Sequence, residues 1–434
     1  MSSPPRFDPR VFIGPPFLPC PACKAAEFGT LTVAKFTVTR RCRACRHTAT
    51  QRIPQLHKKL VYLDQMVYSN MAKSLDPVWA ADRGPQDPFW SRVFDALERA
   101  FKLQLLVCPE STVHEKESAL AKQPTMIRAL YEHFADGVGF EHPVIIHQHQ
   151  LCVCLWAELS GQTPTYYIPR ALILHGDPDE WMDRIRISVN VAGLEPDPQV
   201  QRSVKDRSYA AMQQWFERWR TEKDKSFEDW YRLERQGHAI NYEHLFKEHL
   251  QFMGQVMSGA AAITEDVWNP RLETEIVPAL LRVAEEAGYA GTDRLNIAIA
   301  FLRSDAGCDA PANDLTALLM ASLARKAASG QQRPPSPGMW NDITAISSFL
   351  PYCDAMFLDN ECAGLLREEP LKGKIAAFGT RIFSSRTRED FIEYLAAMEC
   401  EAGLDHARLV EEIYGEDWCV PYREVLIHQR DRET

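Results

Sequence analysis

The sequence predicts an α/β protein in which a parallel sheet is split by a large helical insertion and preceded by a small β-rich module. Three observations predict this architecture. Two Cys-x-x-Cys pairs enclose a β-branched run close to the N-terminus. Short apolar segments then alternate with an amphipathic helical stripe, which is typical of strand, helix and parallel strand. A long stretch of helical pattern separates this region from a second one that holds further apolar strands.

The first module, residues 1–57, consists of a Pro-rich lead-in over residues 1–19 and a β-rich unit over residues 20–52. Within it, Thr30–Val38 has the alternation of a hairpin strand that would bring the two cysteine pairs together. Two such pairs supply four thiolates for tetrahedral zinc, the arrangement of a zinc ribbon. The predicted ligands are Cys20, Cys23, Cys42 and Cys45. Four thiolates leave no open coordination position, so this zinc is expected to be structural.

Positive charge is concentrated in this module. Residues 1–59 hold eleven Lys/Arg and two carboxylates, a net charge of +9. Because the whole chain has a net charge of −10, the remaining residues carry −19. A positively charged N-terminal domain followed by a negatively charged remainder suits a protein whose first domain contacts phosphate. A solvated or protein-docking surface is the alternative. The predicted substrate-binding side chains flank the second cysteine pair: Arg40, Arg41, Arg43 and Arg46.

The first half of the α/β core is assigned to residues 58–140. Leu60–Leu63 is a short apolar run typical of a buried strand. The segment Asp87–Leu103 places its large apolar side chains on one helical stripe, and Leu103–Cys108 reads as a second strand. Strand, helix and strand in this order favour a parallel sheet.

The helical insertion is assigned to residues 141–338 and the second half of the core to residues 339–434. Helices are expected over Tyr209–Arg235, Glu243–Ala262 and Glu273–Gly288. The Pro/Gly-rich stretch Gly330–Gly338 is typical of a linker. The expected elements after it are a helix over Trp340–Leu350 and strands over Asp354–Leu358 and Ala376–Phe383.

Acidic residues follow or flank the predicted strands. The carboxyl ends of parallel strands and the starts of the following helices meet at one sheet edge, where ligands bind. Carboxylates gathered there repel one another and suit Mg²⁺ or Mn²⁺, which activates water for attack on phosphate. The candidates are Asp64, Glu115, Asp342 and Asp359, with Glu110 or Glu117 as alternatives to Glu115. An ordinary role at helix N-termini is the alternative for Glu115 and Asp342.

Two segments resemble PIN-like nuclease domains. In Leu60–Ala72, with its YLDQMVYSNMA, an aspartate ends a first strand, and in Asn341–Leu366 an aspartate opens a helix before a strand that ends in another. The resemblance assigns Asp64, Glu115, Asp342 and Asp359 to the acidic quartet of that family. It departs at Met66, where the family often has Asn or Ser, and in the length of the insertion.

The resemblance implies a metal-dependent endonuclease that hydrolyses phosphodiester bonds, with a toxin-type or antiphage role by analogy. It favours RNA as the substrate, while nothing in the residues excludes DNA. Asp64, Asp342 and Asp359 would ligate Mg²⁺ or Mn²⁺, and Glu115 would ligate or orient water. The alternative is a catalytically inactive PIN-like fold that binds nucleic acid or serves as a scaffold through its ribbon. A protein partner or an oligomer is compatible with either function.

Other features are less informative. The chain has no secretory signal pattern and no apolar run long enough for a membrane span, so we expect a cytoplasmic protein without membrane contact. The eight cysteines outside the two pairs are expected to be small buried side chains. His114 and Asp354 are expected to be structural. The pair His147 and His149 alternates on what reads as a strand, without a third metal ligand.

Overall fold

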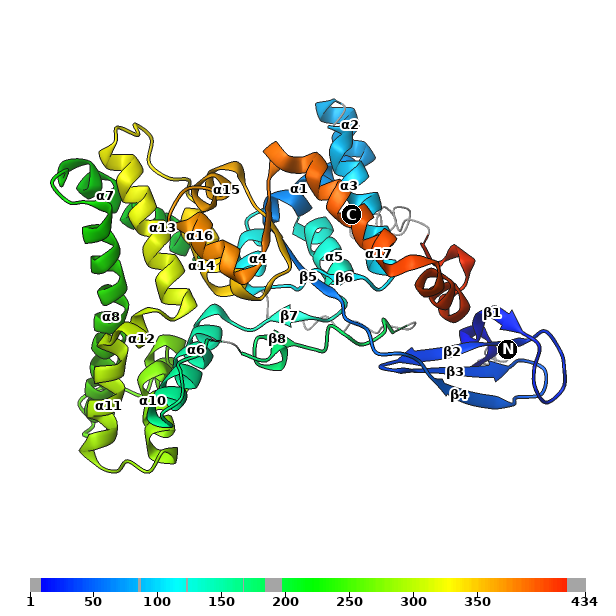
Figure 1. Ribbon diagram of the computed structural model, residues 1–434, viewed down its shortest axis with the longest axis horizontal. Coiled ribbons are helices and arrows are strands. Elements are labelled where there is room, and N and C mark those ends of the chain that lie inside the picture. Colours follow the sequence, from blue (N-terminus) through cyan, green and yellow to red (C-terminus); the bar gives the residue numbers. More distant parts are fainter. Residues whose placement is uncertain (1–8, 85–86, 122–123, 167, 184–196, 420–434) are drawn as a thin grey trace, which may run out of the picture.

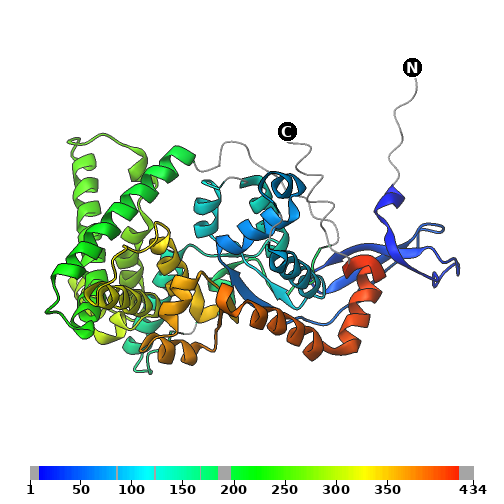
Figure 2. The same ribbon diagram turned by 90° about the horizontal axis from the view of Figure 1, so that it is seen from above.

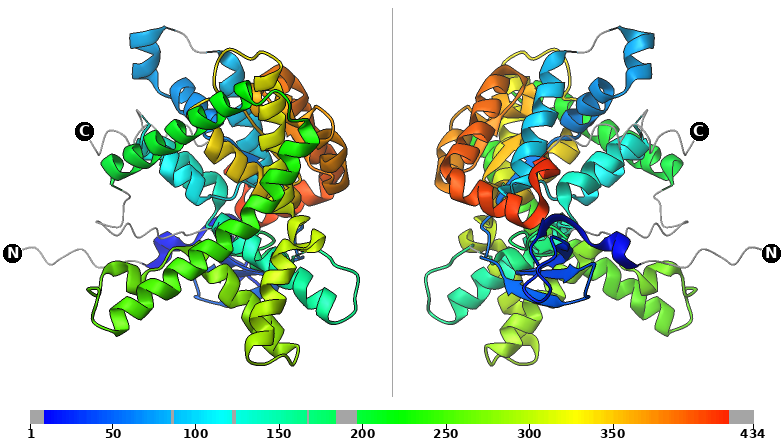
Figure 3. Two further views of the ribbon diagram at one scale, coloured as in Figure 1. Left: turned by 90° about the vertical axis from the view of Figure 1, so that its left-hand side faces the viewer. Right: turned by 90° about the vertical axis from the view of Figure 1, so that its right-hand side faces the viewer.

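The computed structural model describes residues 9–84, 87–121, 124–166, 168–183 and 197–419. A small antiparallel sheet lies at one end of the molecule, a parallel sheet with its helices lies in the middle, and a group of long helices forms the other end (Figures 1 and 2). Figure 3 views these two ends in turn. The mixed α/β class is confirmed. Within the described residues, none of the helices has both the length and the apolar character needed to cross a bilayer.

The N-terminal module is a four-stranded antiparallel sheet in the order β1-β2-β3-β4. Its strands are β1 (Gly14–Leu18), β2 (Phe28–Ala34), β3 (Thr37–Cys42) and β4 (Thr48–Arg52). The predicted β-rich unit is confirmed, but the single strand predicted over Thr30–Val38 is wrong. The chain turns at Lys35, whose φ is 54°, so this run forms both strands of a hairpin.

The central sheet is parallel throughout, with the order β10-β9-β5-β6. Its strands are β5 (Lys59–Leu63), β6 (Leu106–Val107), β9 (Ala355–Phe357) and β10 (Arg381–Phe383). All four predicted strands exist, but three are shorter than predicted. In the segment predicted as the fourth strand, residues 376–378 instead end helix α16 (Leu371–Phe378). Strands from the two halves of the chain therefore pair directly, β5 beside β9.

The alternation of β5 explains why this sheet is buried on both faces. Leu60 and Tyr62 point into one apolar cluster, while Val61 and Leu63 point into another. A strand that is apolar at every position suits a parallel sheet with helices on both faces. The second cluster is covered by α1 (Gln65–Leu75), α3 (Pro88–Lys102), α5 (Pro124–Ala135) and α17 (Arg388–Tyr414).

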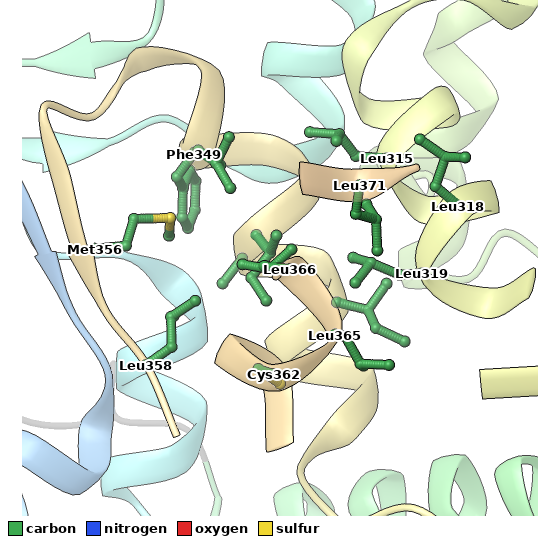
Figure 4. Close-up of a cluster of buried hydrophobic side chains, with 14 of the residues drawn as sticks. Leu315, Leu318, Leu319, Phe349, Met356, Leu358, Cys362, Leu365, Leu366 and Leu371 are labelled. Carbon is green, nitrogen blue, oxygen red and sulfur yellow. The ribbon is translucent and has the colours of Figure 1, made fainter. Parts of the chain in front are cut away.

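The first apolar cluster joins the sheet to the helical end of the molecule. The helices that contribute to it include α13 (Pro311–Ala328), α14 (Met339–Phe349), α15 (Asn360–Leu366) and α16. Figure 4 shows Leu315 and Leu319 of α13 packing toward Leu365 and Leu366 of α15, with Met356 of β9 on the other side. This packing fixes α14 and α15 at the carboxyl edge of the sheet.

The remaining helices correct two expectations. The helix predicted over Tyr209–Arg235 is interrupted: α7 (Pro198–Thr221) ends before α8 (Phe227–Met257), which begins at a Ser226 capping box. The polar residues 222–226 between the two helices have the pattern of a solvated helix, so the sequence pattern did not reveal the break. The His147–His149 segment lies in a helix, α6 (Pro143–Leu159), and not in a strand. Of the segment expected to be helical, residues 184–196 lie outside the described residues, as do residues 1–8 of the lead-in.

The linker over Gly330–Gly338 is confirmed as a connection between α13 and α14. Three further helices complete the helical end, α10 (Ile276–Glu286), α11 (Thr292–Arg303) and the short α12 (Asp305–Cys308). A two-stranded antiparallel pair consists of β7 (Gly139–Phe140) and β8 (Leu174–His175), and Gly139 forms a parallel bridge with Glu110, which follows β6. Helices α2 (Pro77–Arg83), α4 (Thr112–Ser118) and α9 (Glu265–Trp268) are short.

Candidate metal centres

The four predicted zinc ligands converge. Sγ of Cys20 lies 3.6 Å from Sγ of Cys45, and Sγ of Cys23 lies 3.7 Å from Sγ of Cys42. All four sulfur atoms lie within 4.8 Å of one another. Four thiolates at the Zn–S distance of about 2.3 Å in a tetrahedron would be separated by roughly 3.8 Å. The arrangement therefore fits a closed tetrahedral metal site such as structural zinc.

The two cysteine pairs form equivalent turns. The amide of Lys24 donates to the carbonyl of Cys20 at 2.9 Å, and that of Arg46 donates to the carbonyl of Cys42 at 3.1 Å. Lys24 and Arg46 both have positive φ, 63° and 64°. The residue after each second cysteine thus reverses the chain in the same way, which aims each pair of thiols at the other.

The arginines beside this site have different surroundings. Arg40 is buried, and its guanidinium donates to the carbonyl of Glu412 at 2.8 Å, so it attaches the sheet to the end of α17. Arg43 lies over the ring of Phe17 and donates to a backbone carbonyl. Both side chains therefore make contacts within the protein. Burial removes Arg40 from the predicted phosphate contacts, and its packing makes Arg43 less available for them. Arg46 is exposed and Arg41 half-buried, so these two remain candidates.

The second candidate centre lies at the carboxyl edge of the parallel sheet. Asp64 directly follows β5 and caps α1, its carboxylate accepting from the Met66 amide at 2.8 Å. Its own amide donates to the carbonyl of Phe357 at 2.9 Å, which fixes it beside the end of β9. Asp359 follows β9 and caps α15 through the amide of Cys362, at 2.6 Å. Adjacent parallel strands thus deliver both aspartates to one edge.

Asp342 approaches from α14. Its carboxylate and that of Asp359 lie with the Cys362 thiol inside 4.8 Å, a group of ligand atoms able to hold a metal ion. The linker reaches the same place, because a methyl group on Gly338 would lie 3.7 Å from Asp342 Oδ2 and 4.0 Å from Glu117 Oε1. Three of the four predicted acidic positions are therefore brought together.

The fourth predicted position, Glu115, is exposed, and Glu117 lies at the cluster in its place. Glu117 Oε1 accepts a hydrogen bond from the Asn341 side chain of α14 at 3.0 Å. Helical periodicity gives the reason: the buried side chains of α4 include Val113 and His114, and Glu117 follows them by four and three residues. That spacing was the sequence signal for Glu117.

Burial and mutual repulsion perturb these carboxyl groups. Burial, with the charges of Glu117 and Asp359, raises the pKa of Asp64 to about 7 against the opposing Met66 amide. The pKa of Asp342 is raised well above its usual range by burial and then by Asp64 and Glu117. Burial also raises the pKa of Glu117, although Asn341 and Lys205 oppose it. Asp64, Glu117 and Asp342 are each half-buried as whole residues.

Two residues of the cluster lie outside the sequence prediction. Glu361 adds a further carboxyl group, whose pKa is raised by burial and by Asp359. Cys362 is buried, and burial followed by the charges of Asp342 and Asp359 raises its thiol pKa well above its usual range. Both follow Asp359 within the first turn of α15, so helix position was the only signal for them.

Comparisons with protein-family models, with curated proteins and with solved structures find no match.

His114 and Asp354 are structural, as expected. His114 Nε2 lies 2.9 Å from the carbonyl of Leu63, and its ring is stacked between Tyr62 and Tyr131. Burial lowers its pKa to about 4, so the neutral ring donates from Nε2 and ties α4 to the end of β5. Asp354, at the opposite end of β9, accepts from the Leu60 amide and the Lys59 ammonium, both at 2.9 Å.

A cavity of about 790 Å³ is lined by none of the residues of the two centres. Arg170, one of its lining residues, lies 3.7 Å from the carboxylate of Asp354 at the amino edge of the sheet, and Lys374 is ion-paired with Asp314. His147 is also distant from the acids, because it is buried in α6 against the hydroxyl of Tyr242, at 2.7 Å. Neither feature contributes to the acidic cluster.

Proposed function

We propose that this protein is a metal-dependent endonuclease that hydrolyses phosphodiester bonds, with RNA as the preferred substrate. The observation that carries the proposal is the convergence of Asp64, Glu117, Asp342 and Asp359 at the carboxyl edge of a parallel sheet. These residues come from four separate segments of the chain, and their carboxyl groups raise one another's pKa. Such a cluster destabilises the fold unless it has a ligand, and a divalent cation relieves the repulsion.

Asp64, Asp342 and Asp359 are the proposed ligands of Mg²⁺ or Mn²⁺. A bound ion of this kind supplies Lewis-acid polarisation of a phosphoryl oxygen and acidifies bound water. Glu117 takes the role first assigned to Glu115, that of ligand or orienting base for water. Its hydrogen bond from Asn341 holds it toward α14. The helix caps made by Asp64 and Asp359 fix their rotamers before any ligand arrives.

The resemblance of the two acidic segments to PIN-like domains supports the same function and is the source of the preference for RNA. Its order of acidic residues, strand end, helix, helix start and strand end, agrees with the elements that carry the cluster. A catalytically inactive nucleic-acid-binding protein is the second candidate. Met66 favours it, because an apolar side chain stands where the family often has Asn or Ser.

Cleavage of labelled single-stranded RNA and DNA, with Mn²⁺ or Mg²⁺ and with a chelator, tests the proposal. We expect metal-dependent cutting that Asp64→Asn reduces at least about a hundredfold, because even groups that only support a ligand contribute 10–100-fold to metal sites. Asn retains the cap to the Met66 amide, so loss of folding is not expected. Absence of cutting by the native protein, with binding retained, would establish the second candidate.

A further inference from the structure

The acidic cluster borders a small cavity built partly by the helical insertion. The cavity has a volume of about 40 Å³ and lies between α4, α7, α14 and the end of the linker. Glu117 and Asn341 line it together with Lys116, Lys205 and Trp340. This volume admits water but no nucleotide, so a polymeric ligand would lie across the opening.

Positive charge lies beside the acids at this opening. The ammonium group of Lys205 is close enough to Glu117 to lower the pKa of that carboxyl group against the effect of burial. Lys116, the residue before Glu117 in α4, is exposed and also lines the cavity. Among the described residues, neither ammonium group forms an ion pair. Two lysines without an ion pair, beside acids that could hold a divalent cation, match a chain of phosphates, with one phosphate at the metal and its neighbours at the lysines.

An exposed aromatic side chain completes the surface. Trp340 is 38% exposed although it lies in the first turn of α14, two residues before Asp342. Its ring centroid is 5.8 Å from that of Trp215 in α7, at an interplanar angle of 51°, which supports the indole from one side. A partly exposed indole supported in this way can serve as a platform for an unpaired base.

We infer that Lys116, Lys205 and Trp340, the Lys–Trp surface, bind a single-stranded nucleic acid next to the scissile phosphate. The lysines contact flanking phosphates, and Trp340 stacks on a base, which a duplex would keep inside its helix. This inference rests on the proposed function for the identity of the polymer. It gives the helical insertion a role, since α7 supplies Lys205 and supports Trp340.

The ribbon is less suited to this contact. It joins the amino end of β5 through residues 53–58, whereas the acids lie at the carboxyl end of that strand. Two of its four arginines are engaged in packing. The Lys–Trp surface therefore sets the affinity for the segment that is cut.

Binding of labelled single-stranded RNA to the full chain carrying Asp64→Asn, measured by anisotropy without divalent metal, tests this inference. Trp340→Ala should weaken binding about 5- to 150-fold, because each stacked base contributes roughly 1–3 kcal/mol. Trp340→Phe should retain most of it. Lys205→Ala and Lys116→Ala should each make the negative slope of log affinity against log salt less steep by about 0.7. Lys205→Arg should restore the slope of the native protein.

The control is Arg46→Ala in the ribbon, for which we expect less than about a twofold change. Unchanged affinity in Trp340→Ala and Lys205→Ala, together with a loss in Arg46→Ala, would overturn the inference in favour of the ribbon. Absence of any nucleic-acid binding would overturn it as well. Binding that depends on the Lys–Trp surface in a protein that never cuts would retain the inference and reject the proposed nuclease.

Discussion

The two candidate metal centres of this protein are built in opposite ways. The cysteine site draws its ligands from residues 20–45, in two equivalent turns joined by hairpin strands. The acidic site draws on residues 64–361, and adjacent strands from the two halves of the chain deliver Asp64 and Asp359. Thiols are neutral when protonated, so the first site is tolerable without metal. Partly buried carboxylates repel one another, so the second is costly without it.

This difference decides what each site contributes. A closed set of four thiolates stabilises a small sheet and leaves no position for a substrate. Carboxylate oxygens gathered at a sheet edge repel one another, and a bound metal ion relieves this repulsion. Such an ion keeps coordination positions for water and phosphate. The first site is therefore the candidate for a structural metal, and the second is the candidate for chemistry.

The largest expected effect is at the cysteine site. Cys42→Ser should abolish zinc binding and unfold the four-stranded sheet, because zinc binding contributes about 10–16 kcal/mol in comparable peptides. Elemental analysis should show the loss of zinc, and hydrogen exchange should show loss of protection in β2 and β3 with β5 and β9 unchanged. Cys400→Ser, at an exposed cysteine of α17, is the matched control. Zinc retained in Cys42→Ser would contradict the tetrahedral assignment.

The same contrast separates what the sequence predicted from what it did not. Spacing alone identified the four cysteines, because their ligand geometry is encoded within a short segment. The acidic site depended on strand pairing across nearly the whole chain, yet the position after each apolar strand was enough for Asp64 and Asp359. Glu117 required the face of α4, which the first choice of Glu115 ignored. Burial of Arg40 by α17, over 370 residues away in sequence, has no local signal.

The assignment of Glu117 gives a matched pair of substitutions on one helix. Glu117→Gln should lower metal-dependent cleavage at least about a hundredfold, and Glu115→Gln should change it by about twofold or less, because Glu115 is exposed and away from the cluster. Steady-state cleavage rates at several Mn²⁺ concentrations provide the measurement. Equal losses in both variants, or a larger loss in Glu115→Gln, would show that the acids are grouped differently.

Electrostatic cost at the acidic site should appear as a pH-dependent stability. The pKa of Asp64 is raised from its usual value of 3.8 to about 7, so its ionisation destabilises the folded state as the pH rises between these values. Without metal, Asp64→Asn should match the native protein below about pH 4 and exceed its stability by about 2–4 kcal/mol above pH 7. Denaturation midpoints at each pH provide the measurement.

Metal should reverse this ranking. Saturating Mn²⁺ at high pH should raise the denaturation midpoint of the native protein more than that of Asp64→Asn, and the difference should shrink as the pH falls, because protonated carboxyl groups do not ligate. A native protein that is more stable than Asp64→Asn at high pH without metal would mean that the Asp64 carboxylate is already compensated within the fold.

The smallest effect concerns the attachment of the ribbon to the body. Arg40→Ala removes a charge-assisted hydrogen bond of 2.8 Å to the Glu412 carbonyl from a side chain that is 5% exposed, at a cost of about 2 kcal/mol. Arg46→Ala, at an exposed turn, should cost less than about 0.5 kcal/mol. Arg40 contacts the end of α17 and is not a zinc ligand, so both variants should retain zinc. Only Arg40→Ala should expose the end of α17 to hydrogen exchange. Loss of zinc in Arg40→Ala would instead show that docking onto α17 is needed to hold the cysteine pairs together, and the ribbon would then not be a local structure.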